Sequence, residues 1–148
     1  MELNNFLVEA KVNTYASNGE SGETKLADGS KEFRFEKEGF KYRDRYFGSR
    51  TFIGEEIVFQ NEEPIWSMNY YGGVVSGVES SSAYEFLKEA LQKVSLEKPF
   101  RGPDNFKKND WEYMNRPEGS IEKFIGEETI SFKGKVIYKL NYRGGVIK

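Results

Sequence analysis

Apolar residues recur with a helical period in two stretches of the chain. In the later stretch they lie three and four residues apart, the spacing of one face of an α-helix. These residues are Ala83, Phe86, Leu87, Ala90, Leu91 and Val94. The earlier stretch, at about residues 4–15, has Leu3, Phe6, Leu7 and Ala10 on one side. The pattern therefore predicts two amphipathic helices.

After each predicted helix, a polar loop leads into segments in which apolar and polar residues alternate, as in half-buried strands. The expected loops cover residues 16–31 and 95–109. Turns are expected at Glu38-Gly39, at residues 61–63 and at Lys133-Gly134, between alternating segments. Each helix is thus followed by a meander of three or four strands, and meanders are antiparallel.

An internal repeat is the most informative pattern. Residues 52–75 and 124–147 align without a gap at an offset of 72, and 11 of the 24 aligned positions are identical. Such a repeat predicts one domain, residues 1–148, made of two copies at about residues 4–75 and 82–148. The expected fold class is α+β, with two copies of a helix plus an antiparallel meander. We expect a curved antiparallel sheet backed by two helices, with a pseudo-twofold axis between the halves.

The composition narrows the chemistry. The chain has no Cys and no His, which excludes thiolate chemistry and removes the commonest general base. Its 22 basic and 24 acidic residues nearly balance, so binding to nucleic acid by phosphate neutralisation is not expected. No apolar run is long enough for a membrane span, and the first residues do not resemble a signal peptide. We expect a cytoplasmic protein with no cofactor and no membrane partner.

Two carboxylates stand out on the strands that read FIGEE. Alternation places Glu128 on an otherwise apolar strand face, and Glu56 takes the equivalent position in the first copy. A buried carboxylate must find a partner or shift its pKa upward. These two residues are either a functional acid pair in a cleft between the halves or structural groups. As structural groups, each Glu caps a backbone group or pairs with an Arg or Lys such as Arg43, Arg45 or Arg143.

Glycine lies in the middle of the same strands, at Gly54 and Gly126. A strand glycine indicates a bulge or the close approach of another group. A Trp or Tyr ring lying over each glycine would account for it.

The last strand of each copy supplies the remaining candidates. Trp66 and Tyr70 share a face that is most simply core, whereas Asn69 and Asn141 point the other way, before a Gly-Gly pair. Such an Asn either bonds its local backbone or binds a ligand. We predict no catalytic and no metal-binding residue. The ligand-binding candidates are Glu56, Glu128, Asn69, Asn141, Tyr70, Tyr142, Trp66 and Tyr71.

Three segments resemble an uncharacterised prokaryotic family, a domain of unknown function. They are residues 41–73, the KPFRGP segment at 98–103 and the terminal YRGGVIK at 142–148. Members of that family occur alone or behind a helix-turn-helix DNA-binding domain. The resemblance implies a stand-alone copy of a domain that can act as a sensor, and it supplies no catalytic residues.

Three functions remain open at this point. The first is a non-catalytic ligand-sensing or protein-interaction module, because aromatic-lined clefts between packed elements are usual ligand sites. The second is a carboxylate-based, hydrolase-like enzyme that uses the pairs Glu55/Glu56 and Glu127/Glu128 as acid and base. The third is a structural homodimer that associates through a sheet edge or face. The expected partner is a small molecule or a protein, and the sequence leaves the oligomeric state open.

Overall fold

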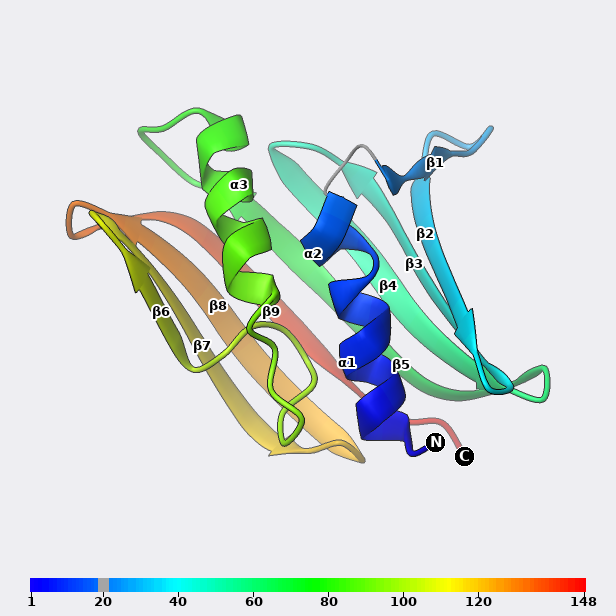
Figure 1. The fold of residues 1–148 in the computed structure, drawn as a ribbon. Coiled ribbons are helices and arrows are strands. Elements are labelled where there is room, and N and C mark those ends of the chain that lie inside the picture. The colour runs from blue at the N-terminus through cyan, green and yellow to red at the C-terminus, as the bar shows by residue number, and fades with distance from the viewer. Residues whose placement is uncertain (19–21) are drawn as a thin grey trace.

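The computed structural model of the protein describes residues 1–18 and 22–148. Within these residues, nine antiparallel strands form one curved sheet in the order β1-β2-β3-β4-β5-β9-β8-β7-β6 (Figure 1). The expected α+β class, with an antiparallel sheet and two long helices, is confirmed. The helices are α1 (Leu3–Val12), α2 (Tyr15–Asn18) and α3 (Ser80–Leu91). The strands are β1 (Thr24–Lys25), β2 (Lys31–Lys37), β3 (Phe40–Gly48), β4 (Thr51–Gln60), β5 (Glu63–Val74), β6 (Asn105–Lys108), β7 (Trp111–Ser120), β8 (Lys123–Phe132) and β9 (Lys135–Val146).

The three predicted turns are confirmed as tight hairpins. Glu38 and Gly39 have φ angles of 49° and 84°, and Lys133 and Gly134 have 51° and 80°. Positive φ at both central residues gives a two-residue turn whose twist matches that of the flanking strands. The third turn, Asn61-Glu62, has the same signs. Each meander therefore turns where the alternation of apolar and polar residues is interrupted.

The segment between α1 and β2 differs from the loop expected over residues 16–31. It contains part of α2 and the short strand β1, which pairs with the beginning of β2. Elements this short carry no measurable hydrophobic period, so alternation could not reveal them. Residues 19–21 of the expected loop lie outside the described residues.

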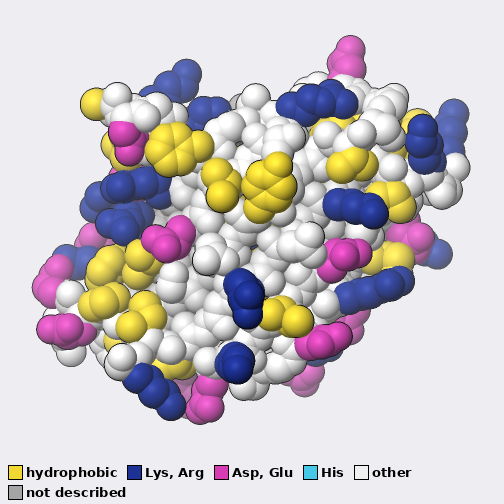
Figure 2. Space-filling model, turned by 180° about the vertical axis from the view of Figure 1, so that it is seen from behind, with side chains coloured by type: hydrophobic (Ala, Val, Ile, Leu, Met, Phe, Trp, Pro, Cys, Tyr) yellow, Lys and Arg dark blue, Asp and Glu magenta, His cyan; other side chains and the backbone are white. Residues whose placement is uncertain are grey.

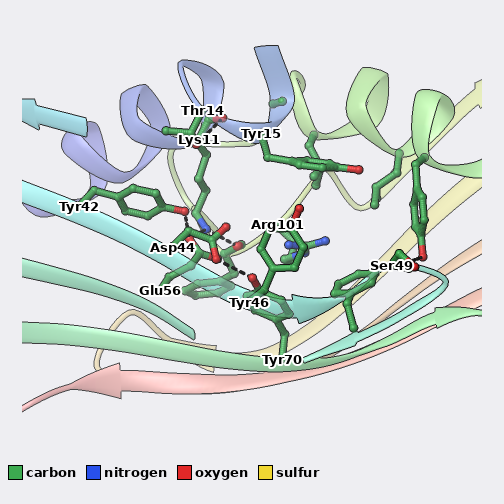
Figure 3. A pocket seen from close by; sticks show the side chains of 16 residues that line it. Lys11, Thr14, Tyr15, Tyr42, Asp44, Tyr46, Ser49, Glu56, Tyr70 and Arg101 are labelled. Carbon is green, nitrogen blue, oxygen red and sulfur yellow. Dashed lines mark hydrogen bonds and ion pairs between the residues drawn. The ribbon is translucent and has the colours of Figure 1, made fainter. Parts of the chain in front are cut away.

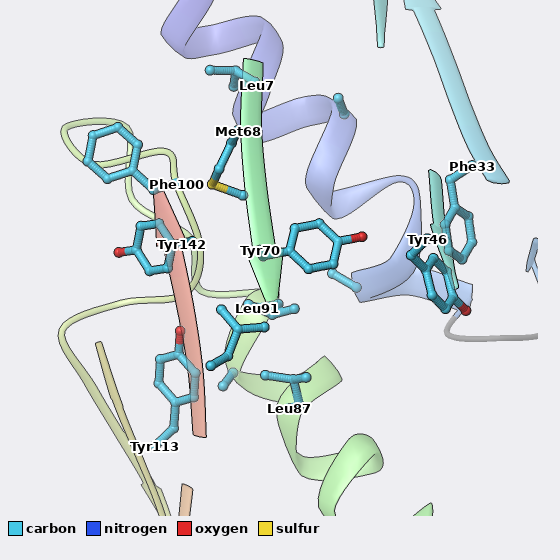
Figure 4. Packing of buried hydrophobic residues seen from close by; sticks show 14 of the residues in the cluster. Leu7, Phe33, Tyr46, Met68, Tyr70, Leu87, Leu91, Phe100, Tyr113 and Tyr142 are labelled. Carbon is cyan, nitrogen blue, oxygen red and sulfur yellow. The ribbon is translucent and has the colours of Figure 1, made fainter. Parts of the chain in front are cut away.

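All three helices lie against the same face of the sheet (Figure 1). The predicted apolar sides face the strands: Phe6 of α1 stacks on Phe40, and Phe86 of α3 stacks on Phe106. The core between helices and sheet is rich in aromatic side chains (Figure 4). No helix in the described part of the chain has the length and apolar character that a membrane span requires.

The pairing of β5 with β9 forms the middle of the sheet. Tyr70 lies opposite Tyr142, with Trp66 opposite Val146 and Val74 opposite Tyr138. β4 and β8 continue the sheet on the two sides of this pair. Tyr70 and Tyr142 both belong to the buried core, and their rings turn away from each other (Figure 4).

Each of these tyrosines lies over a strand glycine, as the sequence predicts. Gly54 is the cross-strand neighbour of Tyr70, and Gly126 is the neighbour of Tyr142. A Cβ atom at either glycine would overlap the tyrosine ring. The glycines therefore make room for aromatic side chains that reach back across the neighbouring strand.

We predict that Gly126→Ala lowers the free energy of unfolding by about 1–3 kcal/mol, because the added methyl group displaces the Tyr142 ring. Urea unfolding of the single variants and of the double variant with Tyr142→Ala forms a thermodynamic cycle. The cost of the alanine should shrink when the ring is absent. An unchanged cost would show that the ring is not what requires glycine.

Candidate functional site

A narrow pocket lies between the helices and the first half of the sheet (Figure 3). Its volume is about 60 Å³, well below the roughly 300–1,000 Å³ of drug-sized pockets. Buried Lys11, Asp44 and Glu56 line its inner part, whereas exposed Ser49 and half-buried Tyr84 lie at its outer part. The pocket therefore suits a small ligand, or the head group of a longer one.

Glu56 on β4 is held as an ion pair at the inner end. Its Oε1 accepts hydrogen bonds from Lys11 Nζ at 2.6 Å and from Tyr42 Oη at 2.5 Å. Lys11 also donates to the carbonyl oxygen of Phe100 at 2.7 Å. Burial lowers the pKa of Lys11, and the neighbouring Glu56 opposes that shift. The ammonium group of α1 thus supplies the charge that a carboxylate under a helix requires.

Asp44 on β3 lies directly opposite Glu56 in the strand register. Its Oδ1 accepts a hydrogen bond from Tyr70 Oη at 2.5 Å. Burial, followed by the negative charge of Glu56, raises the pKa of Asp44 from 3.8 to about 7. Among the described residues, no hydrogen bond reaches the other oxygen, Oδ2, and no cation forms an ion pair with Asp44. Asp44 is nevertheless only 8% exposed.

Glu128 on β8 has the most complete set of partners. Arg101 binds it with two nitrogens, Nε at 3.0 Å and Nη2 at 2.8 Å, and Tyr113 and Tyr138 donate at 2.5 and 2.6 Å. Burial alone would raise the pKa of Glu128, but Arg101 and the two hydroxyl groups outweigh it, and the net pKa is lowered. Glu128 is therefore a structural anion rather than an available acid.

Next to Glu128, the chain itself fills the space above the sheet. Asn115 Oδ1 accepts a hydrogen bond from Tyr142 at 2.7 Å, and its Nδ2 donates to the carbonyl oxygen of Gly102 at 3.0 Å. The amide nitrogen of Gly102 donates to Tyr113 Oη at 2.9 Å. The polar groups around Glu128 form a second polar cluster, beside the one around Glu56, and they are bonded to the KPFRGP segment.

Aromatic rings form the walls between the inner and outer ends of the pocket. Phe52 meets Tyr46, Tyr70 and Tyr84 edge to face, with centroids 6.3, 5.8 and 5.9 Å apart. The hydroxyl group of Tyr84 donates to the carbonyl oxygens of Ser49 and Arg50, which anchors α3 to the β3–β4 connection. The pocket therefore offers apolar and π surface beside a buried carboxyl group.

The structure divides the predicted site residues between the two faces of the sheet. On the helix face, Glu56 and Tyr70 line the pocket. Glu128 and Tyr142 belong to the second cluster, and Trp66 is fully buried, with its indole nitrogen bonded to the Ile121 carbonyl oxygen. The other candidates point to the open face.

Asn69, Asn141 and Tyr71 come together on the open face, in a broad depression of about 760 Å³ that Arg116 and Arg143 also line. Figure 2 shows this face, where hydrophobic side chains form separate groups among charged ones. All five of these residues are exposed. This surface therefore offers contact area, but it lacks the buried polar group that marks the narrow pocket.

The expected pairing of each glutamate with a Lys or an Arg is confirmed, but the three arginines given as examples are wrong. Lys11 and Arg101 bind the glutamates instead of Arg43, Arg45 or Arg143. Because side chains alternate along a strand, arginines next to Asp44 or Tyr142 point away from the helix face. The same alternation separates Glu55 from Glu56 and Glu127 from Glu128, so neither adjacent pair shares one site.

Sequence reasoning missed three groups that define the pocket. Asp44 could have been found, because it alternates with Tyr42 and Tyr46 on the strand face that the sequence predicts to be buried. Lys11 also left a signal, since it follows Leu7 by one helical turn on the apolar side of α1. Arg101 left none, because it lies in an irregular segment whose path only the folded chain defines.

Fold and site together define an α+β protein in which one antiparallel sheet carries buried carboxyl groups beneath helices. Within that class, the chain belongs to the family DUF5680, described as a domain of unknown function, whose model matches residues 44–147. No similar protein was found among the curated proteins or the solved structures. The family resemblance of the sequence is therefore confirmed, and it brings no established activity.

We predict that Arg101→Met lowers the free energy of unfolding by roughly 3–5 kcal/mol at pH 7, because it leaves Glu128 charged and buried without a cation. The lowered pKa of Glu128 means that the ion pair stabilises the fold above its ordinary pKa of 4.5 and loses this effect below it. The penalty should therefore shrink in acid. Chemical unfolding at pH 7 and pH 4 measures it, with exposed Arg116→Met as the control. A penalty that is equal at both pH values would contradict this explanation.

We predict the opposite sign for Asp44→Asn, which should stabilise the protein at pH 8. Between pH 3.8 and about 7 the unfolded chain loses the Asp44 proton while the folded chain keeps it, so stability falls as pH rises. Asparagine removes this loss, which amounts to at most roughly 4 kcal/mol for a shift of that size. Thermal unfolding from pH 4 to pH 8 measures the difference, with exposed Asp104→Asn as the control. A destabilised variant at pH 8 would contradict the assignment.

Proposed function

We propose that this protein is a non-catalytic domain that binds a small molecule in the pocket between α1, α3 and the first half of the sheet. One observation carries the proposal: Asp44 is buried at the pocket, yet its Oδ2 has no hydrogen-bond partner among the described residues. Oδ2 is not among the buried side-chain atoms that lack a partner, so this oxygen keeps contact with the space of the pocket. A ligand that donates a hydrogen bond to it would use an acceptor that the described residues leave unused.

The two halves of the sheet carry different residues at equivalent positions, and this difference supports the proposal. We infer that they are copies of one module, related by a pseudo-twofold axis between β5 and β9. The inference is supported by the sequence repeat and by the central register, in which Tyr70 pairs with Tyr142, 72 residues further on. Equivalent strands then carry Tyr42 with Glu56 in one copy and Tyr113 with Glu128 in the other.

Within this duplicated scheme, Asp44 corresponds to Asn115. Both side chains accept a hydrogen bond from the central tyrosine, Tyr70 or Tyr142. Asn115 is then bonded to Gly102, whereas the corresponding space beside Asp44 is the pocket. One copy thus fills its site with its own chain, and the other leaves room for a ligand.

The geometry favours binding over the hydrolase-like alternative. Glu56 and Glu128 are both held by cations, and neither Glu55 nor Glu127 lies on their face of the strand. Association through a sheet edge or face and a cytoplasmic location stay predictions.

We predict that small fragments bind in this pocket and that Ser49→Trp weakens their binding at least tenfold, because the indole group covers the outer end. Ser120 follows a glycine at the equivalent place in the other half and is also exposed, so Ser120→Trp is the matched control. Titrations of a fragment library, followed by amide NMR shifts, measure both effects. A library without hits at the pocket, or equal weakening in both variants, would refute the proposed function.

A further inference from the structure

The charges around the pocket are balanced except at one residue. Lys11 pairs with Glu56, and Arg101 pairs with Glu128. Asp44 lies beside these pairs without a cation of its own among the described residues, so the cluster has a net charge of −1 when Asp44 is ionised. The structure therefore lacks one positive charge at the inner end of the pocket.

The second copy shows which kind of atom belongs beside Asp44. At the matching position, Asn115 Nδ2 is a donor and binds the carbonyl oxygen of Gly102, which is an acceptor. Asp44 replaces that donor with a carboxyl oxygen. When the carboxyl group is ionised it can only accept, so the complementary ligand atom is a donor.

The pocket walls suit the same ligand. The rings of Phe52, Tyr70 and Tyr84 pack around the space between Asp44 and the outer end. Aromatic faces attract cations, most strongly where water is excluded. A narrow apolar chain would lie along these rings, while a charged head group reaches the carboxylate.

We propose that the pocket binds a small organic cation, namely a protonated amine on a narrow apolar body, whose ammonium group bonds to Oδ2 of Asp44. This assignment rests on the proposed function and names its ligand class. Lys11 and Arg101 line the pocket and would attract an anion instead, but Lys11 already pairs with Glu56 and Arg101 binds Glu128 with two nitrogens, which neutralises their charges. The unbalanced charge is therefore negative, and it favours the cation.

Binding of the amine should depend on pH through Asp44. The groups that face this residue are Lys11 from α1, Tyr42 on β3, Glu56 from β4, Tyr70 from β5 and Arg101 from the segment before β6. The raised pKa of Asp44, about 7, means that protons compete with the amine below neutral pH. The affinity should be constant between about pH 8 and pH 9, where the amine is still protonated, and fall by up to tenfold per pH unit below pH 7.

The test compares three probes of nearly equal shape, n-butylamine, 1-butanol and butyrate, by NMR titration at pH 8. We expect n-butylamine to bind at least ten times more tightly than the other two. Asp44→Asn should remove this preference, whereas Glu127→Gln, an equal charge change on the open face, should leave it unchanged. The pH dependence of the wild-type protein gives a second readout that needs no variant.

Every other outcome contradicts the ligand class, the role of Asp44 or the proposed function. If 1-butanol or butyrate binds as well as n-butylamine, or if Asp44→Asn keeps the preference, the ligand class is wrong while a binding pocket remains. If the affinity for n-butylamine does not change between pH 8 and pH 6, Asp44 is not its partner. If neither these probes nor a fragment library binds at the pocket, the proposed function fails as well.

Discussion

The antiparallel pairing of β5 with β9 is the constraint on which the rest of the structure depends. It joins a five-stranded region, β1 to β5, and a four-stranded region, β6 to β9, into one sheet and places Tyr70 opposite Tyr142 at the centre. From there each tyrosine reaches over a glycine of the next strand and bonds to a side chain one strand further on, Asp44 or Asn115. Shifting this register by one residue would reverse the faces of one half relative to the other, so the helices could no longer cover both polar clusters from the same side. The central pairing therefore decides where both polar clusters lie.

Buried carboxyl groups are costly, and among the described residues Asp44, Glu56 and Glu128 are buried beneath the helices. Two are compensated: Lys11 serves Glu56, and Arg101 serves Glu128 with two nitrogens. Asp44 instead faces Glu56 across adjacent strands, an arrangement that raises its pKa and weakens the fold at neutral pH. At position 115 an asparagine accepts the equivalent hydrogen bond, from Tyr142, with a neutral side chain. A residue that costs stability where a neutral one would fit is more readily explained by binding than by folding.

The sequence predicts the parts of this structure that depend on local periodicity. The two helices, the hairpin turns, the buried positions of Glu56 and Glu128 and the rings over Gly54 and Gly126 all follow from spacing. The cations that serve the carboxylates do not follow, because Lys11 and Arg101 reach them across 45 and 27 residues. The expectation of Arg43, Arg45 or Arg143 was wrong for a simpler reason. Alternation was applied to the glutamates but not to their partners, and it places those arginines on the opposite face. Asp44 was missed for the same reason, since side chains alternate along its strand as they do along the FIGEE strands.

The proposed duplication also explains how a symmetric scaffold can hold a single site. The two halves carry different residues at three equivalent positions. The helices carry Lys11 and Leu91, β3 and β7 carry Asp44 and Asn115, and the central strands carry Trp66 and Tyr138. In the second half the KPFRGP segment supplies the cation and fills the space with its own peptide group. In the first half the cation comes from the helix. Phe100 and Arg101 of the same segment line the pocket without a hydrogen bond to Asp44, and the space beside Asp44 remains open. In the proposed scheme, the pocket lies in the half whose counter-ion comes from a helix, and the change from an amide to a carboxyl group accounts for the ligand class that we propose.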